Sequence, residues 1–345
     1  MLSQATTSTA EADQIAAACD GDEAAFERLA SAYRSGLHAH CYRMLGSVQD
    51  ADDALQETLL AAWRGLPGFE GRSSLRSWLY RIATHACLRL ASGRRRRVLT
   101  PDYTPARTDT CELGEPVTEP VWLEPYPDLT AGPDTDPEAR YAERESVELA
   151  FVAALQHLPP RQRAVLILRE VLQFSAAEVA GMLQASVAAV NSSLQRARKT
   201  MAEAQPARQR SELDALGEPG QRELIEAFIS AWERADVAAL TTLLTRDARF
   251  AMPPLPAWFD GRPDIERFMT QRMWQTPWRL VPVRANGQLA VACYQGARDQ
   301  DSADGGPFRL SAINVLTLRG GRIAGLTGFL DPGVHRRFRL AAEFR

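Results

Sequence analysis

Residues 175–199, SAAEVAGMLQASVAAVNSSLQRARK, contain two helix signals separated by a tight turn. Ser175 and Glu178 have the spacing of a capping box that opens the short helix AAEVAGML, and Gln184–Ala185 forms the turn. Ser186 is a suitable N-cap for the second helix, whose apolar face is Val190, Leu194, Ala197 and Met201. Two helices joined so closely, the second polar and basic on its outside, are typical of a helix-turn-helix.

The second of these helices carries residue types that read duplex DNA. Asparagine and glutamine pair with adenine, arginine and lysine bind guanine or phosphates, and small residues permit close approach. The candidate DNA-binding positions are Ser186, Ala189, Asn191, Ser192, Gln195, Arg196, Arg198 and Lys199. The alternative is a charged surface helix in an ordinary bundle. The spacing, the caps and the charge together favour the helix-turn-helix.

Residues 11–92 show a helical period almost throughout, which predicts four helices and no strand. Ser47 and Asp50 open the helix VQDADDALQETLLAAWRG, whose apolar face is Ala51, Leu55, Leu59 and Ala62. Its polar positions are Asp50, Asp53, Gln56, Glu57 and Arg64. The loop LPGFEGRSS then leads into another helix, LRSWLYRIATHACLRLA.

This loop and the helix after it combine arginines with aromatic side chains beside glycines. Aromatic rings stack on unpaired bases and arginines bind the backbone, so the combination suits single-stranded nucleic acid. The residues are Phe69, Arg72, Ser73, Ser74, Arg76, Ser77, Trp78 and Arg81. Taken alone, Trp78 is equally well explained as a core residue.

Charge is segregated along the chain, although the net charge of the 345 residues is only −3. Phe69–Arg97 contains eight arginines and one acidic residue and ends in four consecutive arginines, and Ala189–Arg210 is also basic. Acidic residues dominate Asp22–Glu57. Two basic patches separated by acidic stretches indicate a polyanion held at two places, with ordinary solvated helix faces as the alternative.

The composition indicates a soluble globular protein of two or three domains, with 45% apolar and 24% charged residues. No apolar run approaches the roughly 20 residues that span a bilayer, and the N-terminus carries no export signal. The five cysteines are scattered and form no CxxC pair, which predicts neither a disulfide frame nor a zinc site. We expect a cytoplasmic protein without metal or cofactor.

Residues 98–139 contain eight prolines and no sustained period, which predicts a linker. Within it, EPVWLEPYPD (residues 119–128) is extended and apolar, a pattern that suits docking in a groove. We expect its residues to pack against the C-terminal domain, or between that domain and the two helical ones, as an interdomain latch: Trp122, Leu123, Pro125, Tyr126 and Pro127. The alternative is a self-contained loop cluster on the first helical domain.

From about Pro219, helical stretches are followed by alternating apolar stretches separated by Asn286-Gly287 and Gly320-Gly321, both strong hairpin signals. This predicts a separate α+β domain with an antiparallel sheet. The expected organisation is therefore a multidomain chain: a helical domain at 11–97, a linker at 98–139, the helix-turn-helix domain at 140–204, a second linker at 205–218 and the α+β domain at 219–345.

The motifs DADDALQETLLAAW, SLRSWLYRIA, LPPRQR and LQRAR, in this order, resemble regions 2 and 4 of sigma-70-type transcription initiation factors. With only a linker between the two regions, the plan resembles the extracytoplasmic-function group. The resemblance implies an alternative RNA polymerase sigma factor, with core polymerase and promoter DNA as partners. The helix after Ser186 would read the −35 element, while other parts of region 4 bind the β flap of the polymerase.

The resemblance also assigns roles within region 2. The helix from Ser47 to Trp63 would dock on the β′ clamp helices through Asp50, Asp53, Gln56 and Glu57. The Phe69–Ser74 loop and the helix from Leu75, His85 included, would capture the −10 element. In the stretch where the group usually has asparagine, this chain has Ala83-Thr84-His85, and Arg89 replaces a frequent aspartate. Both departures concern the base preference at the −10 element.

The C-terminal domain resembles SnoaL-like folds, the cone-shaped family that includes polyketide cyclases and ketosteroid isomerases. The resemblance implies a candidate pocket lined by Phe250, Trp258, Phe259, Trp274, Trp278 and Tyr294. Asp260, Asp264 and His335 are candidate acids or bases, but no motif distinguishes them. We expect a non-enzymatic domain that regulates the sigma factor in cis, without a dedicated anti-sigma protein; a small ligand is the second reading and catalysis the third.

Two rival functions remain open from the sequence. A one-component regulator would bind operators through the helix-turn-helix and sense a ligand through the cone domain, which leaves the region 2 motifs unexplained. A cyclase or isomerase would need a paired acid and base, and the sequence indicates none.

Overall fold

The structure is a computed structural model that describes residues 13–93, 95–119, 121–128, 147–204, 209–297 and 306–344. The described residues form two compact units. The first holds residues 13–95 and 154–204, and the second holds residues 96–128, 147–153 and 209–344, each with the gaps just given. Residues 129–146, which complete the expected linker and begin the expected helix-turn-helix domain, lie outside the described residues, as does Arg94 of the arginine cluster.

The N-terminal part of the first unit is helical, as predicted. Residues 13–19 are followed by α2 (Glu23–Leu45), α3 (Val48–Gly65), the 3-10 turn η1 (Leu66–Gly68) and α4 (Leu75–Ala91). Side chains of Asp22, Ser47 and Ser74 accept hydrogen bonds from first-turn amides and so begin the three long helices. Gly46 ends α2 at a φ of 71°, a left-handed conformation that glycine adopts without strain.

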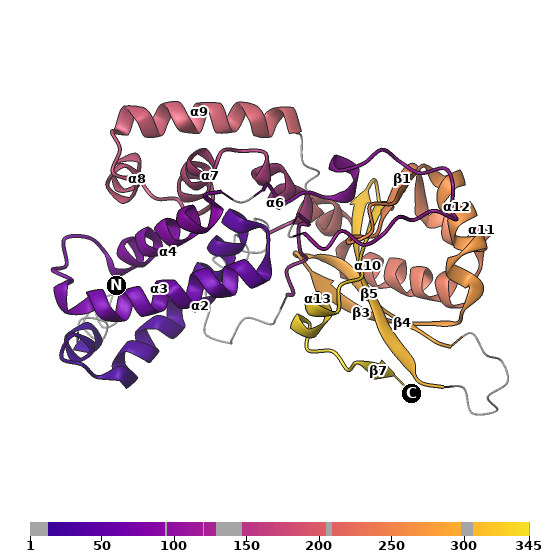
Figure 1. Ribbon diagram of the computed structural model, residues 1–345, viewed down its shortest axis with the longest axis horizontal. Coiled ribbons are helices and arrows are strands. Elements are labelled where there is room, and N and C mark those ends of the chain that lie inside the picture. The colour runs from indigo at the N-terminus through magenta and orange to yellow at the C-terminus, as the bar shows by residue number, and fades with distance from the viewer. Residues whose placement is uncertain are drawn as a thin grey trace. The chain divides into compact units, whose positions relative to one another are not determined.

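The rest of the first unit contains the predicted helix-turn-helix. The helices are α6 (Leu149–Gln156), which begins in the second unit and ends in the first, α7 (Pro160–Leu166), the π-helical η3 (Ile167–Val171), α8 (Ala176–Leu183) and α9 (Val187–Ala204). Ser175 and Glu178 form the capping box, because each side chain bonds the backbone amide of the other. Figure 1 shows α8 and α9 as consecutive helices joined by a short turn.

The second unit is a sheet covered by helices. Its elements are η2 (Thr100–Asp102), α10 (Gln209–Glu233), α11 (Val237–Leu243), β1 (Leu244–Ala251), β2 (Trp258–Asp260), α12 (Arg262–Gln271), η4 (Met273–Gln275), β3 (Trp278–Ala285), β4 (Gln288–Gln295), β5 (Phe308–Arg319), β6 (Arg322–Phe329), α13 (Pro332–Arg337) and β7 (Glu343–Phe344). The strand order is β2-β1-β6-β5-β4-β3, with β7 beside β5. Both predicted hairpin turns are present, with φ angles of 57° and 68° at Asn286-Gly287 and of 59° and 71° at Gly320-Gly321.

Two expectations for this unit were wrong. The sheet is mixed, because β1 arrives from α11 instead of from a hairpin and pairs in parallel with β6. Residues 209–218 are no linker but the start of α10, which has a kink at Gly217. The reason is that Leu213 packs into the core of the domain. Residues 205–208 of the expected linker lie outside the described residues.

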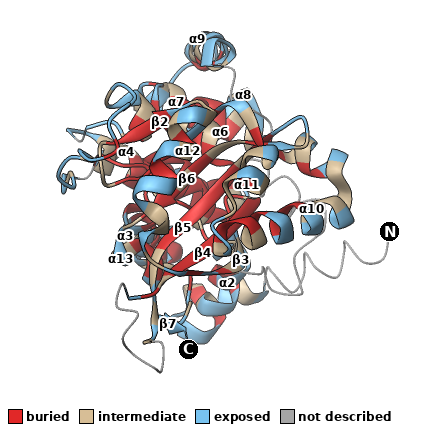
Figure 2. Cartoon of the chain, turned by 90° about the vertical axis from the view of Figure 1, so that its right-hand side faces the viewer, coloured by how far each residue is buried: buried red, intermediate tan, exposed pale blue. Residues whose placement is uncertain are grey.

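The core of the second unit lies between the sheet and its helices. It is rich in aromatic side chains, and Phe228, Trp232, Phe250, Phe259 and Phe268 are all nearly inaccessible to solvent. In Figure 2, β4 and the middle of β5 are coloured as buried residues, with α11 and α12 in front of the sheet. Residues 96–128 belong to this unit, so the predicted linker packs on the C-terminal domain for most of its described length.

Candidate nucleic-acid interface

Helix α9 exposes every residue that the sequence analysis assigned to the −35 element. The Oγ of Ser186 accepts the Ala189 amide at 3.1 Å, which confirms Ser186 as the N-cap. The eight predicted positions, Ser186, Ala189, Asn191, Ser192, Gln195, Arg196, Arg198 and Lys199, are all exposed. Val190, Leu194 and Ala197 are buried on the opposite side. The sequence pattern therefore identified both faces of the helix.

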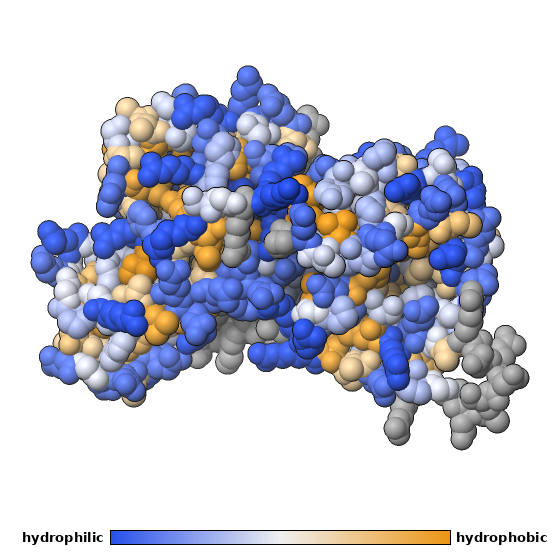
Figure 3. Space-filling view, viewed as in Figure 1, coloured by the Kyte–Doolittle hydropathy of each residue, from blue (hydrophilic) through white to orange (hydrophobic). Residues whose placement is uncertain are grey.

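The exposed face of α9 has two features that the sequence analysis missed. Val187 is 44% exposed at the start of the helix, where an apolar side chain can meet a thymine methyl group. Figure 3 shows an apolar patch at the end of α9 that adjoins α8, and mainly hydrophilic residues along the remainder. Arg198 forms an ion pair with Glu170 of η3 at 2.5 Å, so this arginine is partly engaged within the protein.

The loop expected to capture the −10 element lies on the surface. Arg72, Ser73, Ser74 and Arg81 are exposed, and Phe69 is half-buried with its ring centroid 5.2 Å from that of Trp78. Arg72 forms a solvent-exposed ion pair with Glu70 at 3.0 Å. Such a pair is weak, so a phosphate can readily replace Glu70 as the partner of Arg72. Arg72, Ser73 and Ser74 thus form a continuous accessible segment before α4, and Arg81 is exposed on α4 itself.

Three other residues of the −10 set contact the helix-turn-helix domain within the first unit. The guanidinium of Arg76 donates to the Leu172 carbonyl oxygen at 2.9 Å and lies 4.2 Å from the Phe174 ring centroid. Ser77 donates to Glu178 Oε1 at 3.0 Å, and His85 Nε2 is 2.8 Å from the Met182 carbonyl oxygen. Each of these side chains would have to leave its protein partner in order to contact DNA.

The acceptor in the middle of this contact is Glu178. Hydrogen bonds from the backbone amide and the hydroxyl of Ser175 lower the pKa of Glu178, and the bond from Ser77 and the charge of Arg76 lower it further. The carboxylate form therefore holds both the start of α8 and the contact with α4.

Three residues predicted to bind DNA or polymerase are buried, which differs from their expected roles: Ser77, whose contact is given above, and also Trp78 and Asp50. Trp78 is 8% exposed because its ring lies against Phe69 and against the backbone of Gly65. Asp50 is 7% exposed in the first turn of α3, where a carboxylate is favoured by the helix dipole. Trp78 and Asp50 support the N-terminal domain from inside in this conformation.

Of the remaining residues expected to bind polymerase, only Gln56 lines the groove between α2 and α3. Asp53, Gln56 and Glu57 are exposed, and Glu57 pairs with Arg89 at 2.5 Å. The groove encloses about 480 Å³ and is lined by Glu23, Phe26, Glu27, Arg34, Asp52, Leu55, Gln56, Leu59, Leu60 and Trp63. The sequence analysis placed Leu55 and Leu59 on the apolar face of this helix but did not assign the groove's apolar side chains to binding. Leu60, which is 48% exposed, departs from the amphipathic pattern.

The latch motif divides into two parts. Trp122 packs with Val98, Val117 and Val121, and its ring centroid is 5.0 Å from that of Tyr103. This cluster consists of linker residues alone, so the expected packing of Trp122 on another domain is replaced by a self-contained cluster. It forms because Val98 and Trp122 pair as a short parallel bridge.

The second part of the motif docks on the C-terminal domain, as expected. Pro127 pairs with Ala285 as a β-bridge, and the Tyr126 carbonyl oxygen accepts the Asn286 amide at 2.7 Å. Tyr126 N donates to Asn286 Oδ1 at 2.8 Å. Leu123 and Pro125, which lie in the sequence between the Trp122 cluster and the docked Tyr126 and Pro127, are also buried.

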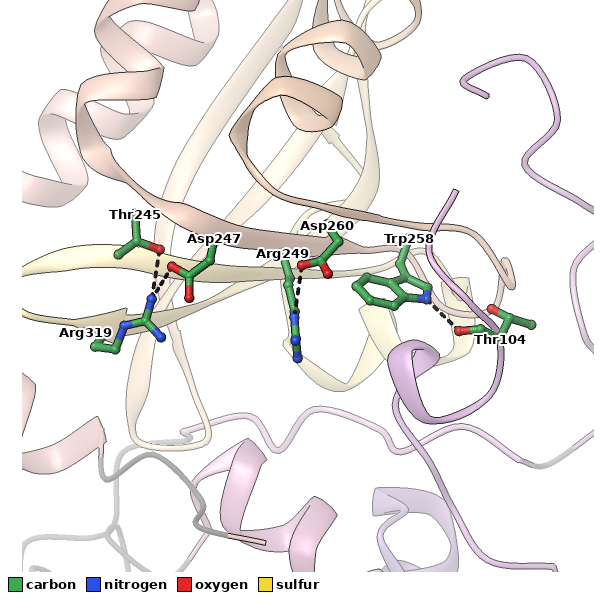
Figure 4. A network of polar contacts seen from close by, with 7 residues as sticks. All are labelled: Thr104, Thr245, Asp247, Arg249, Trp258, Asp260 and Arg319. Atoms are coloured by element: carbon green, nitrogen blue, oxygen red, sulfur yellow. Dashed lines mark hydrogen bonds and ion pairs between the residues drawn. The ribbon is translucent and has the colours of Figure 1, made fainter. Parts of the chain in front are cut away.

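An earlier part of the linker crosses the outside of the cone. Thr104 accepts a bond from Trp258 Nε1 at 2.7 Å through its carbonyl oxygen, and Arg249 lies over the Trp258 ring at 5.6 Å. Figure 4 shows this contact beside the surface ion pairs Arg249–Asp260 and Arg319–Asp247. Trp258, expected in a pocket, is thus covered by the linker.

The other aromatic residues of the candidate pocket pack chiefly on aromatic residues outside the predicted set, such as Trp232 and Phe268. Phe250, Phe259 and Trp278 belong to the core, and the Phe259 ring stacks on Phe268 with centroids 4.4 Å apart. Trp274 Nε1 donates to the Trp232 carbonyl oxygen, and the Tyr294 hydroxyl donates to that of Ala341. The core packing accounts for these residues without a ligand, and the pocket stays a prediction.

The three candidate acids and bases each have a structural partner. Asp260 pairs with Arg249 at 3.3 Å and Asp264 with Arg267 at 3.1 Å. His335 is buried with Nε2 2.8 Å from the Phe329 carbonyl oxygen, and its pKa is lowered by burial. Among the residues that the structure describes, no cluster of three or more potential metal ligands occurs. No helix in the described part is long and apolar enough to cross a membrane.

Comparisons with known proteins cover all three domains. The Sigma-70 region 2 family matches residues 29–97, the Sigma-70 region 4 family residues 148–201, and the SnoaL-like domain family residues 225–326. The ECF RNA polymerase sigma factor SigG of Mycobacterium tuberculosis (strain H37Rv) is 45% identical over 89% of this chain and 82% of its own length. SigJ of the same strain, also an ECF sigma factor, is 30% identical over 87% of this chain and 90% of its own. The crystal structure of SigJ has the same fold, with a TM-score of 0.58 at 22% identity over 90% of this chain and 98% of that chain.

Proposed function

Because the chain belongs to the extracytoplasmic-function group of RNA polymerase sigma factors, we propose that it docks on core polymerase through α3 and reads the −35 element through α9. The −10 element is captured by the Phe69–Ser74 loop and α4. The C-terminal domain regulates these steps in cis. The observation that carries the proposal is α9 itself, which exposes all eight predicted DNA-binding positions on a correctly capped helix that follows a tight turn.

Reading of the −35 element follows from the chemistry of α9. Its N-terminal half offers Asn191 and small side chains to base edges, and its C-terminal half offers Arg196 and Lys199 to phosphates. Val187 adds an apolar contact at the start of the helix. The helix thus combines base contacts with positioning contacts along its length.

Capture of the −10 element requires a rearrangement inside the first unit. The Phe69–Ser74 loop is already accessible, but Arg76, Ser77 and His85 are bound to the helix-turn-helix domain. We therefore assign the described conformation to the sigma factor before promoter binding. Contacts with single-stranded DNA would replace those with Leu172, Glu178 and Met182.

Docking on core polymerase uses the exposed part of α3. Asp53, Gln56 and Glu57 supply polar contacts, and the adjoining groove supplies an apolar surface around Leu60 and Trp63. Exposed apolar side chains beside charged ones are typical of protein interfaces. The acids on the rim suit basic residues on the β′ clamp helices.

The C-terminal domain is proposed to be regulatory and non-enzymatic. Its candidate acids and bases are occupied by structural partners, and residues 96–128 pack against it. A domain that binds the linker between the two DNA-reading regions can restrict both of them without a dedicated anti-sigma protein. We place this activity in the cytoplasm, where core polymerase acts.

Run-off transcription with core RNA polymerase tests the proposal. We expect the full chain to bind core polymerase and to start transcripts from promoters selected in vitro, and the double substitution R196A/K199A to lower the output at least about tenfold. E203A, on the same helix at an exposed position, is the matched control. Operator binding by the chain alone without binding to core polymerase would refute the sigma assignment and favour the one-component regulator.

A further inference from the structure

Four buried polar side chains join the beginning and the end of region 4 within the second unit. Glu148 stands immediately before α6, and Gln209 begins α10. Asn286 is the first residue of the turn between β3 and β4, and Gln288 begins β4. Their exposed fractions are 5%, 1%, 0% and 1%, respectively. We call Glu148, Gln209, Asn286 and Gln288 the tether cluster.

Glu148 forms hydrogen bonds at the beginning of two helices, α6 and α10. Its carbonyl oxygen accepts the Val152 amide at 2.9 Å and so begins α6, the first helix of region 4. Its carboxylate accepts the amides of Gln209 and Arg210 at 2.9 and 2.7 Å, and so caps α10, which follows region 4 in the sequence. A carboxylate at this place satisfies two amides that have no partner within the helix and is favoured by the helix dipole.

The other members attach both ends to the sheet. Gln209 exchanges two hydrogen bonds with the Leu318 backbone of β5, at 3.1 and 2.6 Å. Asn286 Nδ2 donates to the Val147 carbonyl oxygen at 2.6 Å, and Gln288 Oε1 accepts the Leu149 amide at 2.9 Å. Each end of region 4 therefore has its own bonds to the C-terminal domain, and Glu148 bonds the two ends to each other.

From this geometry we infer that Glu148 is a positioning residue, through which the C-terminal domain controls how far region 4 can move. A segment attached at both ends reaches fewer positions than one attached at a single end. The inference rests on the proposed reading of the −35 element by α9. It extends that proposal, because it assigns the coupling between the C-terminal domain and region 4 to the carboxylate of Glu148, and not only to the latch motif at residues 119–128.

The first test is hydrogen exchange in the full chain carrying E148Q. Glutamine keeps the size of the side chain but offers one accepting oxygen instead of two. We expect exchange to increase at least about fivefold at Gln209–Leu213 and also at Val147–Val152, with β4 unchanged. E218Q is the control, since Glu218 is exposed on α10. Faster exchange at Gln209–Leu213 alone would make Glu148 a local helix cap and overturn the inference.

The second test measures positioning directly. With the holoenzyme, transcription is compared on templates that differ only in the spacer between the −35 and −10 elements, shortened or lengthened by about one or two base pairs. E148Q is expected to flatten this dependence at least about threefold, measured as the ratio between the best and the altered spacers. A simple loss of stability would lower all templates equally, and that result would contradict the inference.

A second variant, N286G, keeps the inference testable if E148Q does not fold. N286G removes the amide that holds Val147 and Tyr126, while glycine accepts the φ of 57° at this turn. It should flatten the spacer dependence in the same direction, and a sharp dependence would count against the tether. If the unmodified chain starts no transcripts, the proposed function fails, whereas the hydrogen-exchange result still decides whether the ends of region 4 are coupled.

Discussion

At the residue scale, the N-terminal domain depends on a buried imidazole. His40 is fully buried between helices, and its Nε2 lies 3.0 Å from the Thr84 hydroxyl, which itself donates to the Tyr80 carbonyl oxygen. Burial, helped by the charge of Arg43, lowers the pKa of His40 from 6.5 to about 3. The histidine is therefore neutral in the folded domain at neutral pH and donates to Thr84. Thr84, in the stretch Ala83-Thr84-His85, therefore has a structural role inside the domain.

This histidine gives the domain a pH dependence with a definite sign. Below pH 6.5 the unfolded chain takes up a proton at His40, whereas the folded chain resists it down to about pH 3, so stability falls as the pH falls through this window. The loss from this group is about 2 kcal/mol at pH 5. Urea unfolding at pH 7 and pH 5 should show that H40Q removes this part of the difference, while H157Q, at an exposed position, retains it. Equal pH dependence in the two variants would disprove the assignment.

At the scale of the element, we propose that α9 separates contacts that read bases from contacts that hold phosphates. We expect N191A to weaken binding mainly at promoters with the preferred base pair, by about 1–3 kcal/mol, because only that pair loses its partner. K199A should weaken all sequences alike and reduce the salt dependence by about one counterion. Holoenzyme binding to promoter variants over a range of salt concentrations distinguishes the two. The same loss for both substitutions would mean that α9 binds without reading.

The elements also show what a sequence can predict. Helix α9 was predicted with both its faces, since capping and periodicity are local, and the two hairpin turns were predicted from their glycines. The parallel pairing of β1 with β6 was not, because it depends on residues about 75 positions apart. The contacts of Arg76 and Ser77 with the helix-turn-helix domain were invisible for the same reason, as they join residues 96 and 101 positions apart. The sequence therefore predicted which residues belong to the candidate site, but it did not predict the conformation in which some of them contact the protein itself.

At the scale of the molecule, the first unit holds its region 2 and region 4 segments against each other. The ring of Phe174 lies under the guanidinium of Arg76, and Arg163 donates to the Met44 carbonyl oxygen from the other side of the contact. A charged side chain over an aromatic face contributes roughly 0.5–2 kcal/mol. Separating Arg76 from the Phe174 ring therefore costs a modest amount of free energy, which contacts with DNA can offset.

We therefore expect F174L, which keeps an apolar side chain but removes the ring, to release Arg76. The full chain carrying F174L should bind a labelled single-stranded −10 oligonucleotide about 2- to 30-fold more tightly, measured by fluorescence anisotropy. L166M, which replaces a buried residue of α7 by one of similar size, controls for general loosening of the domain. Unchanged affinity in F174L would show that Arg76 does not limit access to the −10 surface.

The docking of Tyr126 on Asn286 has a consequence for the order in which the chain is made. The two residues are 160 positions apart, so at the usual rate of about 5–20 residues per second a ribosome needs roughly 8–32 seconds to supply the partner. During that interval Tyr126 and Pro127 are synthesised, but Ala285 and Asn286, on which they dock, are not. A chain that stops before the sheet would leave the segment that holds Tyr126 and Pro127 permanently uncovered and prone to aggregate. Deleting the C-terminal domain would thus remove the proposed regulator and a folding partner in one step, and single substitutions in the tether cluster are the way to tell the two roles apart.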